Sequence, residues 1–162
     1  MAWTTPTTRS VSELITPVEW NIDLVDNLLY LYSRPAASYT GVAGGNYTVT
    51  STSYVALDAT NLKLTLTTSS GRVLVGVIMN AAGSATLAAG FRVNIDSGSS
   101  YGYWGDSHQV FVTPNVISFA PLLLTGLSAA SHTFQLEVKV NGNTMTIYRA
   151  TAAPLRFWVM EV

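Results

Sequence analysis

Apolar and polar residues alternate with a period of two over most of the sequence from Tyr47 onward. The stretch LKLTLT places Leu62, Leu64 and Leu66 on one side of an extended chain and polar residues on the other. The stretch FQLEVKV, residues 134–140, repeats the pattern. Because successive side chains of a β-strand point to opposite faces, this alternation predicts strands with one buried face and one exposed face.

Two further stretches, GRVLVGVIM at 71–79 and VISFAPLLL at 116–124, are apolar at odd and even positions alike. Strands of this kind have both faces covered, here by a second sheet and by a partner subunit. The C-terminal LRFWVMEV alternates again, and the runs amount to eight or nine strands separated by Gly, Asn, Ser and Pro. Antiparallel chains of this size close as two packed sheets, so we predict a mainly β, antiparallel β-sandwich of the jelly-roll type.

A turn signal stands between two of the expected strands, EVKV and TMTIY. It is the dipeptide Asn141-Gly142. This dipeptide favours a type I′ turn, so we predict that the two flanking strands pair as an antiparallel hairpin.

The N-terminal part of the chain follows a different pattern. Thr16, Pro17 and Glu19 form a capping box with proline at the first helical position. Pro35 disfavours helical geometry in the residue before it, which ends the helix near Ser33. The sequence therefore predicts one N-terminal α-helix ahead of the β domain.

More than half of the surface of this helix is apolar. Its apolar positions form two adjoining stripes, Val18, Ile22, Val25, Leu29 and Tyr32, and Trp20, Leu24, Leu28 and Leu31. Its polar face consists of Glu19, Asp23, Asp26 and Asn27. A helix on one core surface needs an apolar stripe only about 100° wide. We therefore expect it to contact its own domain and a neighbouring subunit; an ordinary well-buried helix of a monomer is the alternative.

These patterns divide the chain into three parts. Residues 1–35 form an N-terminal arm and the amphipathic attachment helix. Residues 36–46, AASYTGVAGGN, have the small and Gly-rich composition of a flexible linker. Residues 47–162 form the jelly-roll domain.

The composition favours an oligomer. Hydrophobic residues make up 48% of the 162 residues and charged residues only 10%, against roughly 25% charged in typical globular proteins. So few charges leave apolar surface exposed, and such surface marks interfaces. The net charge of −1 offers no basic face for nucleic acid and no polybasic anchor for a membrane, and no apolar run is long enough to span one. We expect protein partners, with neither nucleic acid nor a membrane among them.

Few residues are suited to catalysis. The chain has no cysteine, only two histidines, His108 and His132, and no Gly-x-Ser-x-Gly stretch to present a nucleophilic serine. Asp58, Asp96 and Asp106 stand near turn residues, where Asp bonds to its own backbone. We therefore expect no enzyme, and no catalytic, metal or cofactor site.

Exposed aromatic residues are the best candidates for ligand recognition. Tyr101, Tyr103 and Trp104 stand among glycines in the stretch DSGSSYGYWGD. Aromatic rings in such a position can stack on sugars or anchor a protein contact. In the alternative interpretation they fill the end of the sandwich or a subunit interface, since Tyr101 and Tyr103 would share one face of a short strand.

Two parts of the chain resemble known proteins. The stretches ELITPVEWN and LVDNLLYL, after an arm rich in Thr, resemble the start of many tailed-phage virion proteins. The stretches GLSAASHTFQLEVKV and PLRFWVMEV resemble the last strands of the trimeric jelly rolls of the tumour-necrosis-factor and C1q-like type. His132 opens a strand within this shared motif, which implies a turn hydrogen bond for it.

The resemblance implies a homotrimeric structural protein on the surface of a phage particle, made in the host cytoplasm. It would be a capsid decoration (cement) or head-fibre protein, bound to the major capsid protein or another virion protein by its N-terminal segment. The expected attachment and oligomer contacts are Trp3, Leu14, Ile15, Val18, Trp20, Ile22, Leu24, Val25, Leu28 and Leu29. The rival hypothesis is a tail-fibre or receptor-binding module that recognises a host surface glycan through Tyr101, Tyr103 and Trp104.

Overall fold

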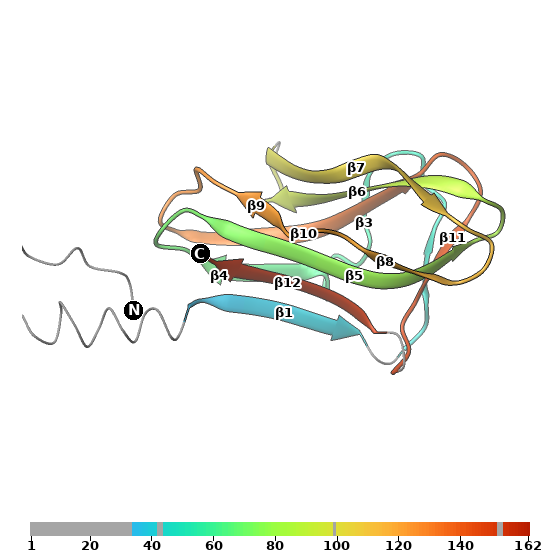
Figure 1. The fold of residues 1–162 in the computed structure, drawn as a ribbon. Coiled ribbons are helices and arrows are strands. Elements are labelled where there is room, and N and C mark those ends of the chain that lie inside the picture. Colours follow the sequence, from blue (N-terminus) through green and yellow to red (C-terminus); the bar gives the residue numbers. More distant parts are fainter. Residues whose placement is uncertain (1–33, 42–43, 99, 152–153) are drawn as a thin grey trace, which may run out of the picture.

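A computed structural model describes residues 34–41, 44–98, 100–151 and 154–162. These residues form two antiparallel β-sheets packed face to face (Figure 1). The predicted mainly β sandwich is therefore confirmed. The predicted N-terminal helix and the ten candidate attachment residues from Trp3 to Leu29 lie outside the described residues.

Sheet A contains seven strands in the described part of the chain. They are β1 (Ala36–Gly41), β2 (Tyr47–Val49), β5 (Val73–Gly83), β8 (Asn115–Ser118), β9 (Leu122–Leu124), β11 (Met145–Tyr148) and β12 (Leu155–Glu161). Their order is β1-β12-β5-β11-β2, with β8 and β9 also paired to β5. Strand β5 is thus the strand to which four others bond.

Sheet B contains five strands in the same described ranges. They are β3 (Val55–Ala56), β4 (Lys63–Thr67), β6 (Leu87–Ile95), β7 (Ser100–Val110) and β10 (Ser131–Val140). Their order is β3-β10-β6-β7, with β4 paired to β10. Strand β10 is the strand of this sheet to which three others, β3, β4 and β6, bond.

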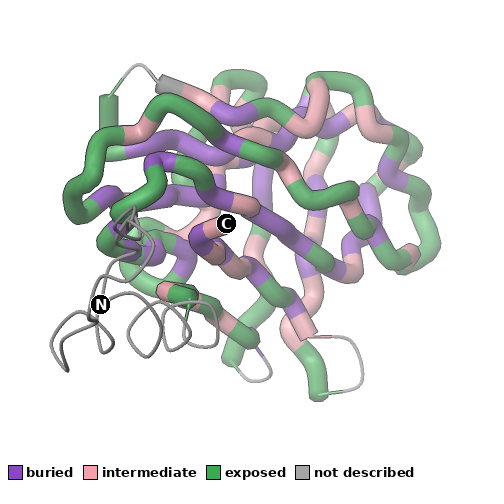
Figure 2. Tube along the Cα trace, turned by 60° about the vertical axis from the view of Figure 1, so that its left-hand side comes forward, coloured by how far each residue is buried: buried purple, intermediate pink, exposed green. Residues whose placement is uncertain are grey.

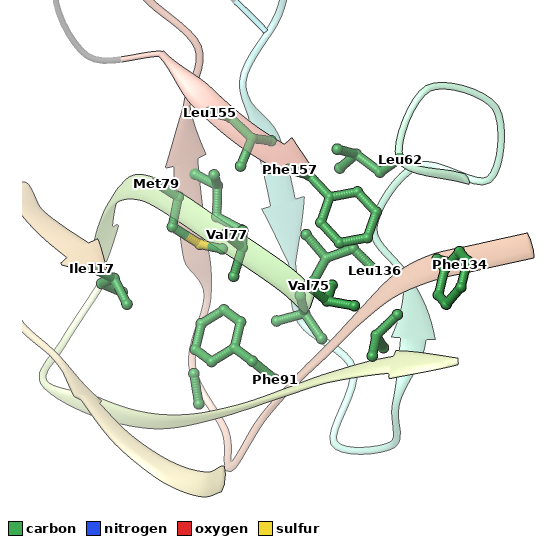
Figure 3. Packing of buried hydrophobic residues seen from close by; sticks show 14 of the residues in the cluster. Leu62, Val75, Val77, Met79, Phe91, Ile117, Phe134, Leu136, Leu155 and Phe157 are labelled. Carbon is green, nitrogen blue, oxygen red and sulfur yellow. The ribbon is translucent and has the colours of Figure 1, made fainter. Parts of the chain in front are cut away.

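The core lies between the two sheets and follows the alternation of the sequence. Leu62, Leu64 and Leu66 are buried, as predicted. Figure 3 shows Phe157 of β12 and Leu136 of β10 pointing into the space between the sheets. Figure 2 shows long runs of exposed residues in the loops, whereas buried residues recur along the strands. Period two therefore correctly predicted which residues face inward.

The predicted hairpin at Asn141-Gly142 is wrong. Strand β10 before the turn belongs to sheet B, whereas β11 after it belongs to sheet A. The backbone N–H of Asn141 donates to the carbonyl of Ala88 at 2.9 Å, and its side-chain Oδ1 accepts from the N–H of Ala88 at 2.9 Å. These two bonds hold Asn141 to strand β6, so the chain crosses from one sheet to the other instead of turning back on itself.

The predicted linker over residues 36–46 is wrong for its first six residues. Residues 36–41 form strand β1, which pairs with β12 from Ala36↔Met160 to Gly41↔Leu155. Ala37 and Tyr39 pack against the core, and Gly41 is buried with no room for a side chain, since a Cβ there would lie 2.9 Å from the Tyr39 ring. Residues 36–41 therefore belong to an edge strand of sheet A and not to a linker.

A buried carboxylate ties the last strand to the β4–β5 loop. Glu161 is fully buried, and its Oε1 accepts hydrogen bonds from the backbone N–H of Ser69 at 2.6 Å and from that of Ser70. Burial alone would raise the pKa of Glu161, but these hydrogen bonds outweigh it and lower the pKa below the usual value of 4.5. The loop therefore depends on an ionised carboxylate inside the fold.

We predict that Glu161→Gln destabilises the protein at neutral pH by about 1–3 kcal/mol, because a neutral amide is a weaker acceptor for the buried loop N–H groups. A carboxylate whose folded pKa is lowered contributes stability above its unfolded value, and loses it as the pH falls through the folded value. Urea denaturation should therefore show wild type and variant converging below pH 4.5. Arg156→Ala, at an exposed position of the same strand β12, is the control and should change stability by less than about 0.5 kcal/mol. An equally small effect of Glu161→Gln at neutral pH would contradict the prediction.

Candidate functional site

An aromatic and charged cluster occupies the outer face of sheet B. Tyr101 and Tyr103 of β7 have ring centroids 6.0 Å apart, and Tyr103 lies edge-on to Tyr54 at 6.2 Å. The register of the sheet places Arg92 of β6 between Tyr103 and Glu137 of β10. We call these residues, together with Asn94, Asp106 and Lys139, the Tyr–Arg cluster.

Arg92 is the centre of the cluster. Its guanidinium carbon lies 3.7 Å from the ring centroid of Tyr101 and 4.2 Å from that of Tyr54, so the cation is held between two aromatic faces. Its Nε donates to Glu137 Oε2 at 2.6 Å, and its Nη1 donates to the Tyr103 hydroxyl at 3.4 Å. Burial alone would lower the pKa of Arg92, but the hydrogen bonds to Glu137 and Tyr103 outweigh this effect and raise the pKa above its usual value. Arg92 is therefore permanently charged and fixed in one orientation.

A second charge pair closes the other side of the cluster. The Tyr54 hydroxyl donates to Asp106 Oδ1, and Lys139 Nζ lies 3.2 Å from Asp106 Oδ2. Burial and the bond to Asp106 raise the pKa of Tyr54, while the bonds from Tyr54 and Lys139 lower the pKa of Asp106. Two cations thus face two carboxylates, and the cluster carries no net charge.

The structure brings Tyr101 and Tyr103 together but places Trp104 elsewhere. A bulge separates the pairs Arg92↔Tyr103 and Phe91↔Gly105, which leaves Trp104 as the extra residue. Its ring stacks on Phe119 with centroids 5.7 Å apart, and its Nε1 donates to the Ala120 carbonyl at 3.2 Å. Trp104 therefore packs under the β8–β9 connection and contributes nothing to the Tyr–Arg cluster.

Most members of the cluster could not be found from the sequence. Tyr54, Arg92 and Glu137 lie on three separate segments, and only the pairing of β10 with β6 and of β6 with β7 brings them together. The local signal in the sequence that pointed to the cluster is the alternation of Tyr101 and Tyr103, which places both rings on one face of a strand.

Ser128, His132 and Asp96 line up in a way that resembles a hydrolytic triad. His132 Nδ1 lies 2.7 Å from Asp96 Oδ2, and its Nε2 lies 3.3 Å from Ser128 Oγ. The same Nε2 is closer to the Ser128 carbonyl, at 2.9 Å. A nitrogen that donates to a carbonyl does not accept a hydroxyl proton, so the geometry favours a doubly protonated imidazole that bridges two loops, in agreement with the turn hydrogen bond expected for His132.

We predict a loss of stability with rising pH that depends on His132. Its bonds to Asp96 and to the Ser128 carbonyl raise its pKa above 6.5, so its contribution is complete below pH 6.5 and is lost as the pH rises through the folded pKa. Urea midpoints measured from about pH 6 to 8 should fall in wild type and stay flatter in His132→Gln. Asp96→Asn should flatten the profile too, because it removes the carboxylate that raises the pKa of His132. The substitution fits the backbone, since Asn tolerates the φ of 56° at this position. Unchanged pH profiles in both variants would contradict this account.

The outer face of sheet A carries a second surface of a different kind. Six of its outward residues on β5 and the neighbouring strands are large and apolar, and we call them the apolar band: Leu74, Ile78, Val116, Leu123, Trp158 and Met160. The register aligns Leu74 with Leu123 on one side and with Met160 on the other. A Cβ at Gly76 would lie 2.2 Å from the Trp158 ring, so the indole lies flat across this glycine. Polar residues interrupt the band at Ile78, which lies between Arg156 of β12 and Ser118 of β8.

The described residues offer no metal site or membrane helix. No group of three or more His, Cys, Asp or Glu side chains there is placed to hold a metal ion. In the same part of the chain no helix is long and apolar enough to cross a membrane.

Comparison with known proteins supports the fold class. No family model matches the chain, and no curated protein matches it. A capsid structure of T=1 particles derived from infectious bursal virus matches with a TM-score of 0.51 and 12% identity, over 80% of this chain and 36% of that one. Eiger TNF from S. frugiperda matches with a TM-score of 0.48 and 12% identity, over 80% of this chain and 94% of that one. The chain thus spans about a third of the viral protein, and the likeness to it establishes a jelly-roll sandwich.

Proposed function

We propose that this chain is a structural protein of a virus particle, a homotrimeric capsid decoration or head-fibre protein of a tailed phage that is bound by its N-terminal segment. The apolar band on the outer face of sheet A carries the proposal. Val116 is 67% exposed, Leu123 46% and Ile78 38%, which is unusual for large apolar side chains on one sheet face. Such a face needs a partner, and a second and third copy of the chain supply one.

The position of strand β1 supports this arrangement. Residue 36 begins the edge strand of sheet A, and its outward side pairs with Met160 of the apolar band. Figure 1 shows β1 starting at the same end of the sandwich as the C-terminus. The attachment segment therefore joins the domain beside the proposed trimer face, where three copies would lie close together. Each copy adds apolar burial, at about 25 cal/mol per Å², and three linked contacts gain from avidity.

The likeness to a viral capsid protein is in accord with this role. A jelly roll in a capsid needs only packing surfaces and stability, and the outer face of sheet A offers a packing surface. The paired carbonyl and carboxylate contacts of His132 likewise fit a structural role.

Ile78→Glu tests the trimer. A charge on the apolar band opposes burial between copies but is tolerated on an exposed position of a monomer. Light scattering should give three times the chain mass of 17.4 kDa for wild type and one times that mass for Ile78→Glu. Thr65→Glu, an exposed residue on the outer face of sheet B, is the matched control and should remain trimeric. A monomeric wild type overturns the proposal.

Deletion of residues 1–34 tests the attachment. We expect the truncated protein to keep its fold, since the described core begins at Ala36, and to lose co-sedimentation with particles that lack the native protein. Circular dichroism checks the fold. Attachment that survives the deletion would show that another surface binds the particle.

A second candidate function is recognition of a host surface glycan, as in a tail-fibre or receptor-binding module. The observation that favours it is the Tyr–Arg cluster, in which Tyr103 is held in place by Tyr54 and Arg92. The cluster lies on the outer face of sheet B, on the opposite side of the sandwich from the apolar band. A trimer packed through sheet A would leave it free.

A further inference from the structure

We propose that the Tyr–Arg cluster binds an electrically neutral saccharide, with the Tyr103 ring as the stacking platform and Asp106 and Lys139 as the polar contacts. The inference rests on the second candidate function, recognition by this face, and names the class of ligand.

Exposure selects the residues that meet a ligand. Tyr103 is 50% exposed and the Asp106 side chain 56%, whereas the side chains of Arg92 and Glu137 are mostly covered. A ligand therefore meets an aromatic ring bordered by a carboxylate and an ammonium group. The apolar C–H face of a pyranose suits the ring, its hydroxyls can donate to Asp106, and they can accept from Lys139.

The covered residues make the surface rigid. Arg92 is clamped between Tyr54 and Tyr101, and it donates to the hydroxyl of Tyr103. Glu137 holds Arg92 on one oxygen and the amide of Asn94 on the other, at 2.9 Å. The platform is therefore formed before a ligand arrives, which reduces the entropy lost on binding.

The charges select a neutral ligand. Arg92 is paired with Glu137 and Lys139 with Asp106, at 2.6 and 3.2 Å. An acidic sugar such as a sialic acid or a uronic acid would have to compete with these carboxylates, and the most exposed charge, on Asp106, would repel it. A neutral sugar can bond to the paired groups without separating them.

Binding of the full chain to two sets of immobilised glycans tests the proposal, one set of neutral hexose oligosaccharides and one of sialylated or uronate-containing oligosaccharides. We expect binding to members of the neutral set, with little change between about 50 and 500 mM NaCl because no net charge is involved. Tyr103→Ala should weaken it by about tenfold or more, and Tyr103→Phe, which keeps the ring, by much less.

Phe111→Ala is the matched control, because Phe111 is an exposed aromatic residue just beyond β7 and outside the cluster. It should bind as wild type does. Circular dichroism and light scattering establish that each variant keeps its fold and mass.

The outcomes separate this inference from the function on which it rests. Binding confined to the acidic set and weakened by salt overturns the neutral class, while recognition of glycans stands. Neutral binding that Tyr103→Ala leaves unchanged moves the site away from the cluster and overturns the inference. No binding to either set overturns the inference and the second candidate function together, and the trimeric virion proposal is judged separately by Ile78→Glu.

Discussion

Strand β5, which carries large apolar side chains on both faces, is the element on which the rest of the structure depends. Its inward side chains, Val73, Val75, Val77 and Met79, are buried in the core. Its edges are filled within the chain, because β12 and β11 bond to one side and β9 and β8 to the other. Its outward side chains include Leu74, which is half-buried, and Ile78, which is exposed. Apolar side chains on an outer sheet face favour burial against a second surface, which the trimer that we propose would provide.

The two sheets therefore present different chemistry to the outside. Sheet A offers the apolar band, which suits burial against another copy of the chain. Sheet B offers the Tyr–Arg cluster, in which both cations are paired with carboxylates and Tyr103 stays half exposed. Because the faces lie on opposite sides of the sandwich, the assembly and the recognition that we propose would not compete for the same surface. This separation allows one small domain to support both proposals.

Local patterns predicted the strands well and their partners poorly. The alternation in LKLTLT and FQLEVKV correctly placed Leu62 and Leu136 in the core, because burial of alternate residues is a property of one strand. The Asn141-Gly142 turn failed, since the hydrogen bonds of Asn141 to Ala88 are contacts between distant segments. The linker prediction failed over residues 36–41 for a related reason: small residues look flexible until a neighbouring strand such as β12 pairs with them.

The sequence by itself determined the class of fold and the inward face of the strands in LKLTLT and FQLEVKV, because these follow from periodicity. Only the tertiary structure decided which strands share a sheet, that Trp104 leaves its tyrosine neighbours at a bulge, and that Arg92 is clamped between Tyr54 and Tyr101. The physical reason is that pairing and stacking join residues far apart in the chain. Their contact depends on the register between strands, and no local pattern encodes that register.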